Sequence, residues 1–194
     1  MQEKIKNTIF LWWNKLQPIH GVVYFVVLLA SCHFAWKMAF VEHTHPRSIS
    51  FLWMDATRIF AFGVDVLNDI VYFFLHDIFN VKVYNIGTYF VYPNATVVDI
   101  VWSCTGFKQA YIFFSIIAFY PGKHMRKLWY IPLGLLIVYA FNVFRIALIT
   151  YLLRDHLGWF ELLHEGSKYV FYALIFLMWV LWAEKFATPS TPKV

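Results

Sequence analysis

The chain has 194 residues, of which 61% are apolar and only 14% carry a charge. Soluble domains average about 45–50% apolar and about 25% charged residues. This composition excludes a cytosolic domain, a disordered chain and a disulfide-stabilised secreted scaffold. The net charge of +5 is too small to suggest a nucleic-acid partner once membrane loops have taken their share of Lys and Arg. The composition indicates a polytopic membrane protein, with 1–194 forming a single integral membrane domain.

The N-terminal part predicts an interfacial segment followed by a first membrane span. Lysines mingle with aromatic residues over 1–18, which suits a helix lying on the membrane surface. The apolar run 19–41 meets the requirement of about 20 residues for crossing a bilayer. The stretch 29–32, which ends at Cys32, has the form of a lipoprotein cleavage box. Because the apolar run continues well beyond it, we expect an uncleaved anchor.

The next segment, 51–79, is amphipathic. Its polar residues recur at helical spacing and form a stripe between large apolar side chains. Four charges on this stripe exclude a span whose whole surface faces lipid. The segment therefore either lies along the membrane surface or crosses the membrane with its stripe turned into the helix bundle. The stripe consists of Asp55, Arg58, Asp65, Asp69 and His76.

The segment 81–102 is rich in β-branched and aromatic residues, and a turn is predicted at its centre over 92–95. These features predict a small β-hairpin. An open two-stranded sheet cannot lie in lipid, because its edge groups would have no hydrogen-bond partners. We therefore expect an extracytoplasmic hairpin.

Three further spans are predicted over 105–120, 128–153 and 169–183. The basic loop 123–127 belongs in the cytoplasm by the positive-inside rule, so the segments just before the second and fourth spans lie outside. The predicted fold is all-α, with four transmembrane helices if the N-terminal lysines are cytoplasmic and five if they are not. We expect a multi-pass protein of the cell (inner or cytoplasmic) membrane.

Cys104 lies where the hairpin ends and a helix is predicted to begin. The positive end of a helix dipole and its free N–H groups favour the thiolate form of a cysteine. Ser103 is a plausible helix cap, Thr105 follows the thiol, and Gly106 permits close approach of another backbone. The alternative is that Cys104 is a small packing residue.

Arg145 interrupts the third span in its outer half. An arginine at such a depth costs at least about 2.5–3.5 kcal/mol, so a function is expected. Asn142 lies three residues earlier on the same helical face and can bond the same partner. The alternative is a structural ion pair with an acid of the polar stripe, such as Asp65 or Asp69.

His164 precedes the last predicted span on the outer face, and a neutral imidazole there can act as a general base and acid. His156, in the same outer loop, is the rival. The stretch 164–168 is not a zincin site, because Lys168 stands where a second histidine ligand is required. His43 and His45 have no third ligand nearby and are expected in a loop, so no metal is predicted.

Cys104, Arg145 and His164 are therefore predicted on one membrane face, at or near the outer ends of three consecutive helices. Short connections make such helices neighbours. A nucleophile, a cationic donor and a base are the groups needed for acyl transfer through a thioester.

These residues resemble the exosortase/archaeosortase family, in a short form. The resemblance rests on three short motifs in this order, spread over a catalytic core at 81–186. Thr105 stands where the family usually has serine, which keeps a hydroxyl beside the nucleophile. The motifs are Ser103-Cys104-Thr105-Gly106, Asn142-Val143-Phe144-Arg145 and His164-Glu165-Gly166.

The resemblance implies a membrane cysteine protease or transpeptidase that cleaves C-terminal sorting signals. Cys104 would be the nucleophile, His164 the general base and acid, and Arg145 the group that stabilises the oxyanion or orients the substrate. Ser103, Thr105 and Asn142 would support them.

The partners implied are exported proteins with a C-terminal transmembrane signal, membrane lipid and an amine-bearing acceptor, with no cofactor. Two other functions remain open: a non-catalytic membrane assembly or export subunit, and a lipid-phosphate or glycan enzyme or transporter that uses Arg145.

Overall fold

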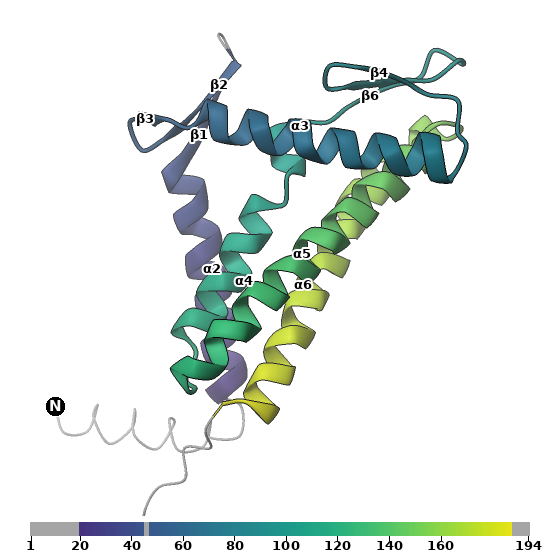
Figure 1. Ribbon diagram of the computed structural model, residues 1–194. Helices are drawn as coiled ribbons and strands as arrows, with labels where there is room; N and C mark the ends of the chain where they lie inside the picture. The colour runs from purple at the N-terminus through teal and green to yellow at the C-terminus, as the bar shows by residue number, and fades with distance from the viewer. Residues whose placement is uncertain (1–19, 45–46, 188–194) are drawn as a thin grey trace, which may run out of the picture.

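The computed structural model describes residues 20–44 and 47–187, so the interfacial segment expected at 1–18 lies outside the described residues. Four helices run side by side along one direction (Figure 1): α2 (His20–Ala39), α4 (Phe107–Phe119), α5 (His124–Leu153) and α6 (Phe160–Lys185). A fifth helix, α3 (Thr57–Phe73), lies across one end of this bundle and continues as the π-helical turn η2 (Phe74–Ile78). The polytopic helical fold is confirmed.

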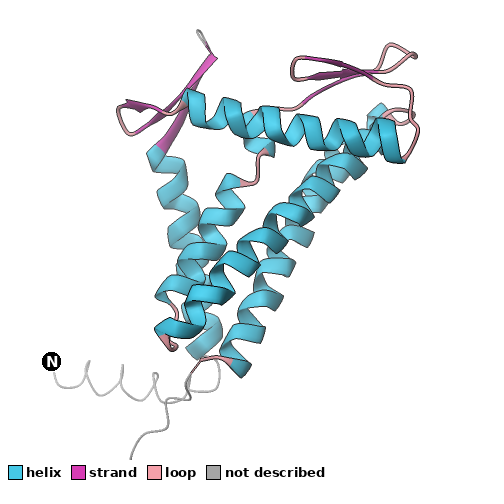
Figure 2. Cartoon of the chain, in the orientation of Figure 1, coloured by secondary structure: helices cyan, strands magenta, loops and turns pink. Residues whose placement is uncertain are grey.

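Length and apolarity alone would select a different set of membrane spans. Four described segments are long and apolar enough to cross a membrane, namely His20–Ala39, Thr57–Ile78, His124–Leu153 and Leu157–Lys185, whereas Phe107–Phe119 is shorter. Helices that cross a bilayer run roughly along its normal, with an average tilt of about 20°. Because α3 is crosswise and α4 follows the bundle, we infer four spans formed by α2, α4, α5 and α6. Figure 2 shows α3 beside both strand regions, at the same end of the bundle.

The predicted hairpin over 81–102 is confirmed and is larger than expected. It is an antiparallel meander of β4 (Tyr84–Ile86), β5 (Tyr89–Val91) and β6 (Val97–Asp99). The predicted turn joins β5 to β6. Two side chains of this turn bond to α5 and its C-cap. The Tyr92 hydroxyl donates to the Thr150 carbonyl at 2.8 Å, and the Asn94 amide donates to the Arg154 carbonyl at 2.6 Å. The turn thereby fixes the sheet to the C-terminal end of α5.

A second three-stranded sheet was not predicted. It consists of β1 (Phe40–Thr44), β2 (Arg47–Phe51) and β3 (Met54–Asp55). The first span therefore ends at Ala39, short of the expected 41, and α3 begins only at Thr57. His43, expected in a loop, belongs to β1, and its Nε2 lies 3.0 Å from the Ser50 hydroxyl; His45 lies outside the described residues.

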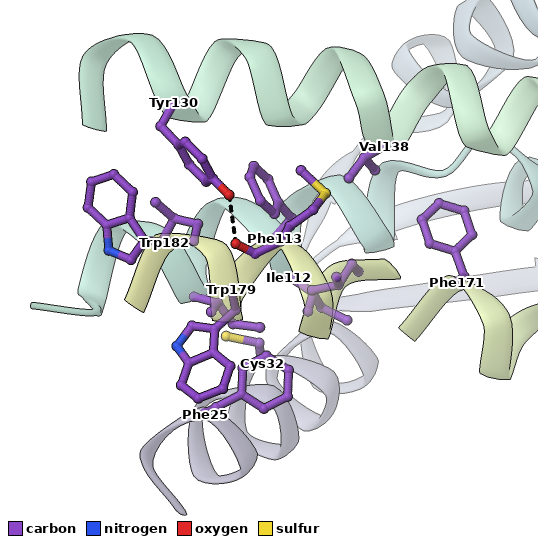
Figure 3. Close-up of a cluster of buried hydrophobic side chains, with 13 residues drawn as sticks. Phe25, Cys32, Ile112, Phe113, Tyr130, Val138, Phe171, Trp179 and Trp182 are labelled. Carbon is purple, nitrogen blue, oxygen red and sulfur yellow. Dashed lines mark hydrogen bonds between the residues drawn. The ribbon is translucent and has the colours of Figure 1, made fainter. Parts of the chain in front are cut away.

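The inner half of the bundle is held by a cluster of buried side chains between α2, α4, α5 and α6 (Figure 3). Its aromatic members include Phe113 and Trp182, and the Tyr130 hydroxyl donates to the Met178 carbonyl at 2.6 Å. Gly134 lets α5 approach α4, because a Cβ there would collide with the Phe113 ring. A second cluster, at the other end, packs α3, η2 and the β4–β6 sheet against α5 and includes Cys104.

Two helix boundaries differ from the sequence prediction in ways that affect the site. Helix α5 begins at His124, so most of the basic stretch 123–127 is already helical. Helix α6 begins at Phe160, well before the expected 169. His164 is therefore a helical residue near the start of α6, where its backbone geometry is fixed by the helix, and does not belong to a loop.

Candidate active site

Cys104 is the last residue of a single 3₁₀ turn, η3 (Trp102–Cys104), between the β4–β6 sheet and α4. Its backbone N–H donates to the Val101 carbonyl at 2.8 Å. The Thr105 hydroxyl donates to the Trp102 carbonyl at 2.8 Å, which closes the turn from the other side. The Cys104 side chain is only 9% exposed. The turn holds the thiol at the end of the bundle that α3 crosses, within the second apolar cluster.

The prediction that Ser103 caps the following helix is wrong. The N-cap of α4 is Gly106, no side chain caps it, and Ser103 is exposed. Gly106 has φ +79°, a left-handed conformation in which glycine is not strained. This conformation separates η3 from α4, so Cys104 does not lie in the first turn of the helix.

The expectation that the pKa of the Cys104 thiol is lowered, which would favour the thiolate, is also wrong. Burial raises the pKa of the Cys104 thiol, and this effect exceeds the opposing effects of the Val101 hydrogen bond and the Arg145 charge, which lower it. Removing an ion from water disfavours its charged form. The thiol is therefore protonated at neutral pH and needs a base to become a nucleophile.

Asn142 connects Cys104 to Arg145. Its side chain is fully buried, and its amide nitrogen donates to the Cys104 carbonyl at 2.7 Å. Its amide oxygen accepts a hydrogen bond from Arg145 Nη2 at 3.3 Å. Gly106 permits this contact, because a Cβ at that position would lie 2.9 Å from Asn142 Cγ. The close approach expected at Gly106 is therefore real, although it is made by a side chain of α5.

Arg145 is 5% exposed and its partners are neutral. Nη1 donates to the Ser167 hydroxyl at 3.4 Å, and the guanidinium carbon lies 5.8 Å from the centre of the Phe171 ring. Its buried Nε has no hydrogen-bond partner. In the described ranges Arg145 forms no ion pair, which contradicts the alternative of pairing with Asp65 or Asp69; both of these are exposed on α3.

His164 joins this arrangement through Ser167. The Ser167 hydroxyl donates to the His164 carbonyl at 2.9 Å while accepting from Arg145. The His164 ring is half-buried, stacks on Phe160 with centroids 5.3 Å apart, and experiences the Arg145 charge. His156, by contrast, is exposed and stacks on Trp159 in the loop between α5 and α6. His164, unlike His156, is therefore joined to Arg145 through Ser167.

A chain of hydrogen bonds therefore runs across three elements, from the Cys104 carbonyl through Asn142, Arg145 and Ser167 to the backbone of His164. Thr105 is nearly fully buried in the same turn as Cys104. Among residues 20–44 and 47–187, no group of three or more His, Cys, Asp or Glu is placed to hold a metal ion. The site consists of a thiol, a cation with a free donor and an imidazole on neighbouring elements.

Ser167 is the member of this chain that sequence reasoning missed. It follows His164 by three residues, the spacing at which a serine hydroxyl reaches back to a helix carbonyl. That signal was available only if α6 was known to begin before His164. Its approach to Arg145 depends on the packing of α5 on α6, which no local pattern encodes.

One family model matches most of the chain. No curated protein and no solved structure matches the chain. The model of the transmembrane exosortase family (Exosortase_EpsH) matches residues 10–181, a range that includes all the residues of the hydrogen-bonded chain. The chain belongs to the transmembrane exosortase family.

Proposed function

We propose that this protein is a membrane cysteine protease or transpeptidase that cleaves C-terminal sorting signals of exported proteins through a thioester. The observation that supports it best is the hydrogen-bonded chain from Cys104 through Asn142, Arg145 and Ser167 to His164. A thiol, a buried cation and an imidazole are the groups that peptide cleavage by a thiol requires. The chain joins the backbone carbonyls of Cys104 and His164 through the side chain of Arg145.

In the first half-reaction, Cys104 Sγ attacks the scissile carbonyl carbon while His164 accepts the thiol proton. The carbonyl π bond opens, and the negative charge that develops on its oxygen is stabilised by Arg145. The oxyanion then collapses, the C–N bond breaks, and His164 returns the proton to the leaving amine. The products are a thioester on Cys104 and the released hydrophobic tail.

In the second half-reaction, water or an amine-bearing acceptor attacks the thioester carbonyl. His164 takes a proton from the attacking group, the C–S bond breaks, and the proton returns to the Cys104 sulfur. Water gives a new C-terminal carboxylate, and an amine gives a new amide. The protonated resting thiol makes the base essential, so this mechanism depends on His164 more than one based on a free thiolate would.

The environment of Arg145 favours this role over a purely structural one. A buried arginine placed only to hold helices together is stabilised best by a carboxylate partner. Arg145 has amide and hydroxyl partners, and its Nε–H is unpaired. An unpaired donor on a buried cation suits an oxygen that becomes negative only during the reaction.

We place the reaction on the extracytoplasmic face of the cell membrane. The basic residues that open α5 lie at the opposite end of the bundle from Cys104, and such residues favour the cytoplasmic side. The substrates would be exported proteins held in the same membrane by their C-terminal hydrophobic segment.

The test compares the C-termini of surface proteins in source cells that carry the native chain, Cys104→Ala or Cys32→Ala. Cys32 is the matched control, because it is also buried but lies in the first apolar cluster, away from the network. Mass spectrometry should find hydrophobic C-terminal tails retained on a defined set of proteins in Cys104→Ala alone.

The abundance of each variant in the membrane is measured in parallel. Unchanged C-termini in Cys104→Ala, with the variant at normal abundance and its candidate substrates detected, would exclude the thioester mechanism. Retention of the same tails in His164→Ala but not in His156→Ala would assign the base.

A further inference from the structure

A pocket opens directly beside the nucleophile, where the ends of α2, α3 and α4 meet at the outer end of the bundle (Figure 1). Its volume is about 460 Å³, within the range of small-molecule sites. Ser103 and Thr105, the two neighbours of Cys104, are part of its wall. Most of the other lining side chains are aromatic or charged, and they include Trp36, Phe40, Phe60, Trp102, Lys37 and Lys108.

Two lysines from different helices face this pocket. Lys37 lies near the end of α2, and Lys108 lies in the first turn of α4. Each charge acts on the other, and Lys168 of α6 adds a third positive charge near Lys108. Lys168 is already paired with Glu165 at 2.5 Å, whereas among the described residues neither Lys37 nor Lys108 has a hydrogen-bond or ion-pair partner. The pocket therefore holds two cations that repel each other.

The position of these lysines opposes the usual distribution of charge in membrane proteins. Lysine and arginine favour the cytoplasmic ends of spans, where the stretch that opens α5 carries its own basic residues. Lys37 and Lys108 lie at the other end of the bundle, next to Trp36 and Trp102. Tryptophans are frequent at the level of lipid headgroups, so the two ammonium groups lie at the depth where lipid phosphates lie.

We infer that this pocket binds the phosphate of an anionic lipid headgroup, held by Lys37 and Lys108 between the tryptophan walls, beside Cys104. Basic pockets between transmembrane helices on the cytoplasmic side bind anionic headgroups. The same attraction between ammonium groups and phosphate applies to Lys37 and Lys108 here. Glu42 also lines the pocket, and with two ammonium groups against one carboxylate the site keeps a net positive charge. The pocket lies at the end of α2 and the start of α4, two of the inferred spans, which favours a headgroup that is already anchored in the bilayer.

The test is a binding measurement on the purified full chain, so it does not depend on whether Cys104 is a nucleophile. Native mass spectrometry resolves the lipid-bound states while phosphatidylglycerol or phosphatidylcholine is titrated into the detergent-solubilised protein. We expect Lys37→Gln/Lys108→Gln to bind phosphatidylglycerol about tenfold or more weakly than the native chain. Binding of phosphatidylcholine should be the same in both.

The matched control is Lys123→Gln/Lys185→Gln, which removes the same charge from exposed lysines at the opposite end of the bundle. It should bind phosphatidylglycerol as the native chain does. Equal weakening in the two double variants would overturn the proposal, because the effect would then follow net charge. Displacement of phosphatidylglycerol by an equimolar amount of inorganic phosphate would overturn it too, by assigning the pocket to a free anion.

If the double variant does not fold, Lys37→Gln alone decides the question. Lys37 is exposed, so its substitution removes one cation without disturbing the core. A several-fold loss of phosphatidylglycerol binding is expected, and rescue by Lys37→Arg would show that charge is responsible. Native binding by Lys37→Gln would overturn the proposal.

Discussion

Asn142 and Arg145 lie one turn apart on α5, and both are almost inaccessible. Burying a guanidinium without a carboxylate partner is costly, and the amide and hydroxyl groups that surround Arg145 offset only part of that cost. The charge is therefore left available to a group that enters the site. Asn142 determines where this charge lies relative to Cys104, because it binds the Cys104 carbonyl and the guanidinium at once.

We predict that Asn142→Ala lowers cleavage by at least about tenfold while the protein remains in the membrane. The substitution leaves the buried Cys104 carbonyl and one N–H of Arg145 without partners, a penalty of about 1–3 kcal/mol each. Cleavage is measured from the C-terminal tails of surface proteins. Leu136→Ala, at an exposed position on α5, is the control and should cleave normally. Normal cleavage by Asn142→Ala would remove Asn142 from the site.

The Cys104 thiol gives a prediction about pH. Because burial raises its pKa, the thiolate fraction at a given pH is smaller than for a free thiol of pKa about 8.5. In a Cys32→Ala background, the rate of alkylation by iodoacetamide should reach half its maximum at a pH above about 8.5. Arg145→Met removes a charge that lowers the thiol pKa, so the midpoint should rise further. A midpoint below pH 8 would contradict this assignment.

The residues of the site divide clearly into those that sequence can indicate and those that it cannot. Arg145 stands out by its predicted depth in the membrane, and Cys104 and His164 stand out by their predicted positions just before two spans, on the same face. The protonation state of Cys104 cannot be predicted in this way, because it depends on burial by α3 and α5, which are distant in sequence. The same is true of the contact between Ser167 and Arg145.

At the scale of the element, the junction between η3 and α4 positions Cys104. Gly106 provides a left-handed residue there and, lacking a Cβ, also makes room for Asn142. The two requirements coincide at one position. An alanine would be strained by its backbone conformation and would also push against the Asn142 side chain.

We therefore predict that Gly106→Ala abolishes cleavage by displacing Asn142 from the Cys104 carbonyl. A non-glycine residue in this backbone region costs about 1–2 kcal/mol, which the bundle should tolerate. The measurement pairs tail retention with membrane abundance. Gly166→Ala is the control, since Gly166 lies in the adjacent helix α6 and a Cβ there meets no atom within 4 Å. Full activity in Gly106→Ala would show that Asn142 is not held by this close approach.

The β4–β6 sheet is attached to α5 by side chains of its turn, and the Tyr92 hydroxyl is the buried member of that attachment. Tyr92→Phe leaves the Thr150 carbonyl without this partner. We expect a loss of about 1–3 kcal/mol, visible as a lower melting temperature of the purified protein in detergent. Tyr89→Phe, at an exposed position on the same sheet, should melt as the native chain does. Equal melting of the two variants would contradict the attachment.

The long helices could be predicted from sequence because apolar runs and their polar ends are local signals. The β1–β3 sheet could not. Phe40 and Val41 extend the apolar run of α2 without a break, yet they pair with Phe51 and Ser50 in an antiparallel ladder. Hydropathy does not distinguish the last turn of a span from a strand that packs on it. The π-helical turn η2 at the end of α3 could not be predicted either, because hydropathy does not distinguish a π-helical turn from an α-helical one.

The arrangement of the described elements bears on whether α3 crosses the membrane. α3 has the length and composition of a span and yet lies across the outer end of the bundle (Figure 1). Of its predicted polar stripe, Asp55 belongs to β3 and the other four residues are exposed, while Leu67 and Val71 pack inward on the cluster that contains Cys104. In this position α3 covers the site, which a fifth span would leave open.

This topology predicts that both ends of α3 lie on the same side of the membrane. In a background without native cysteines, Trp53→Cys and Lys82→Cys should both react with a membrane-impermeant maleimide in intact spheroplasts. Both positions are exposed, and they lie just before and just after the α3–η2 helix. Met125→Cys, which is 76% exposed at the start of α5, should react only after lysis. Opposite labelling of Trp53→Cys and Lys82→Cys would make α3 a fifth span and would separate one of the two sheets from Cys104.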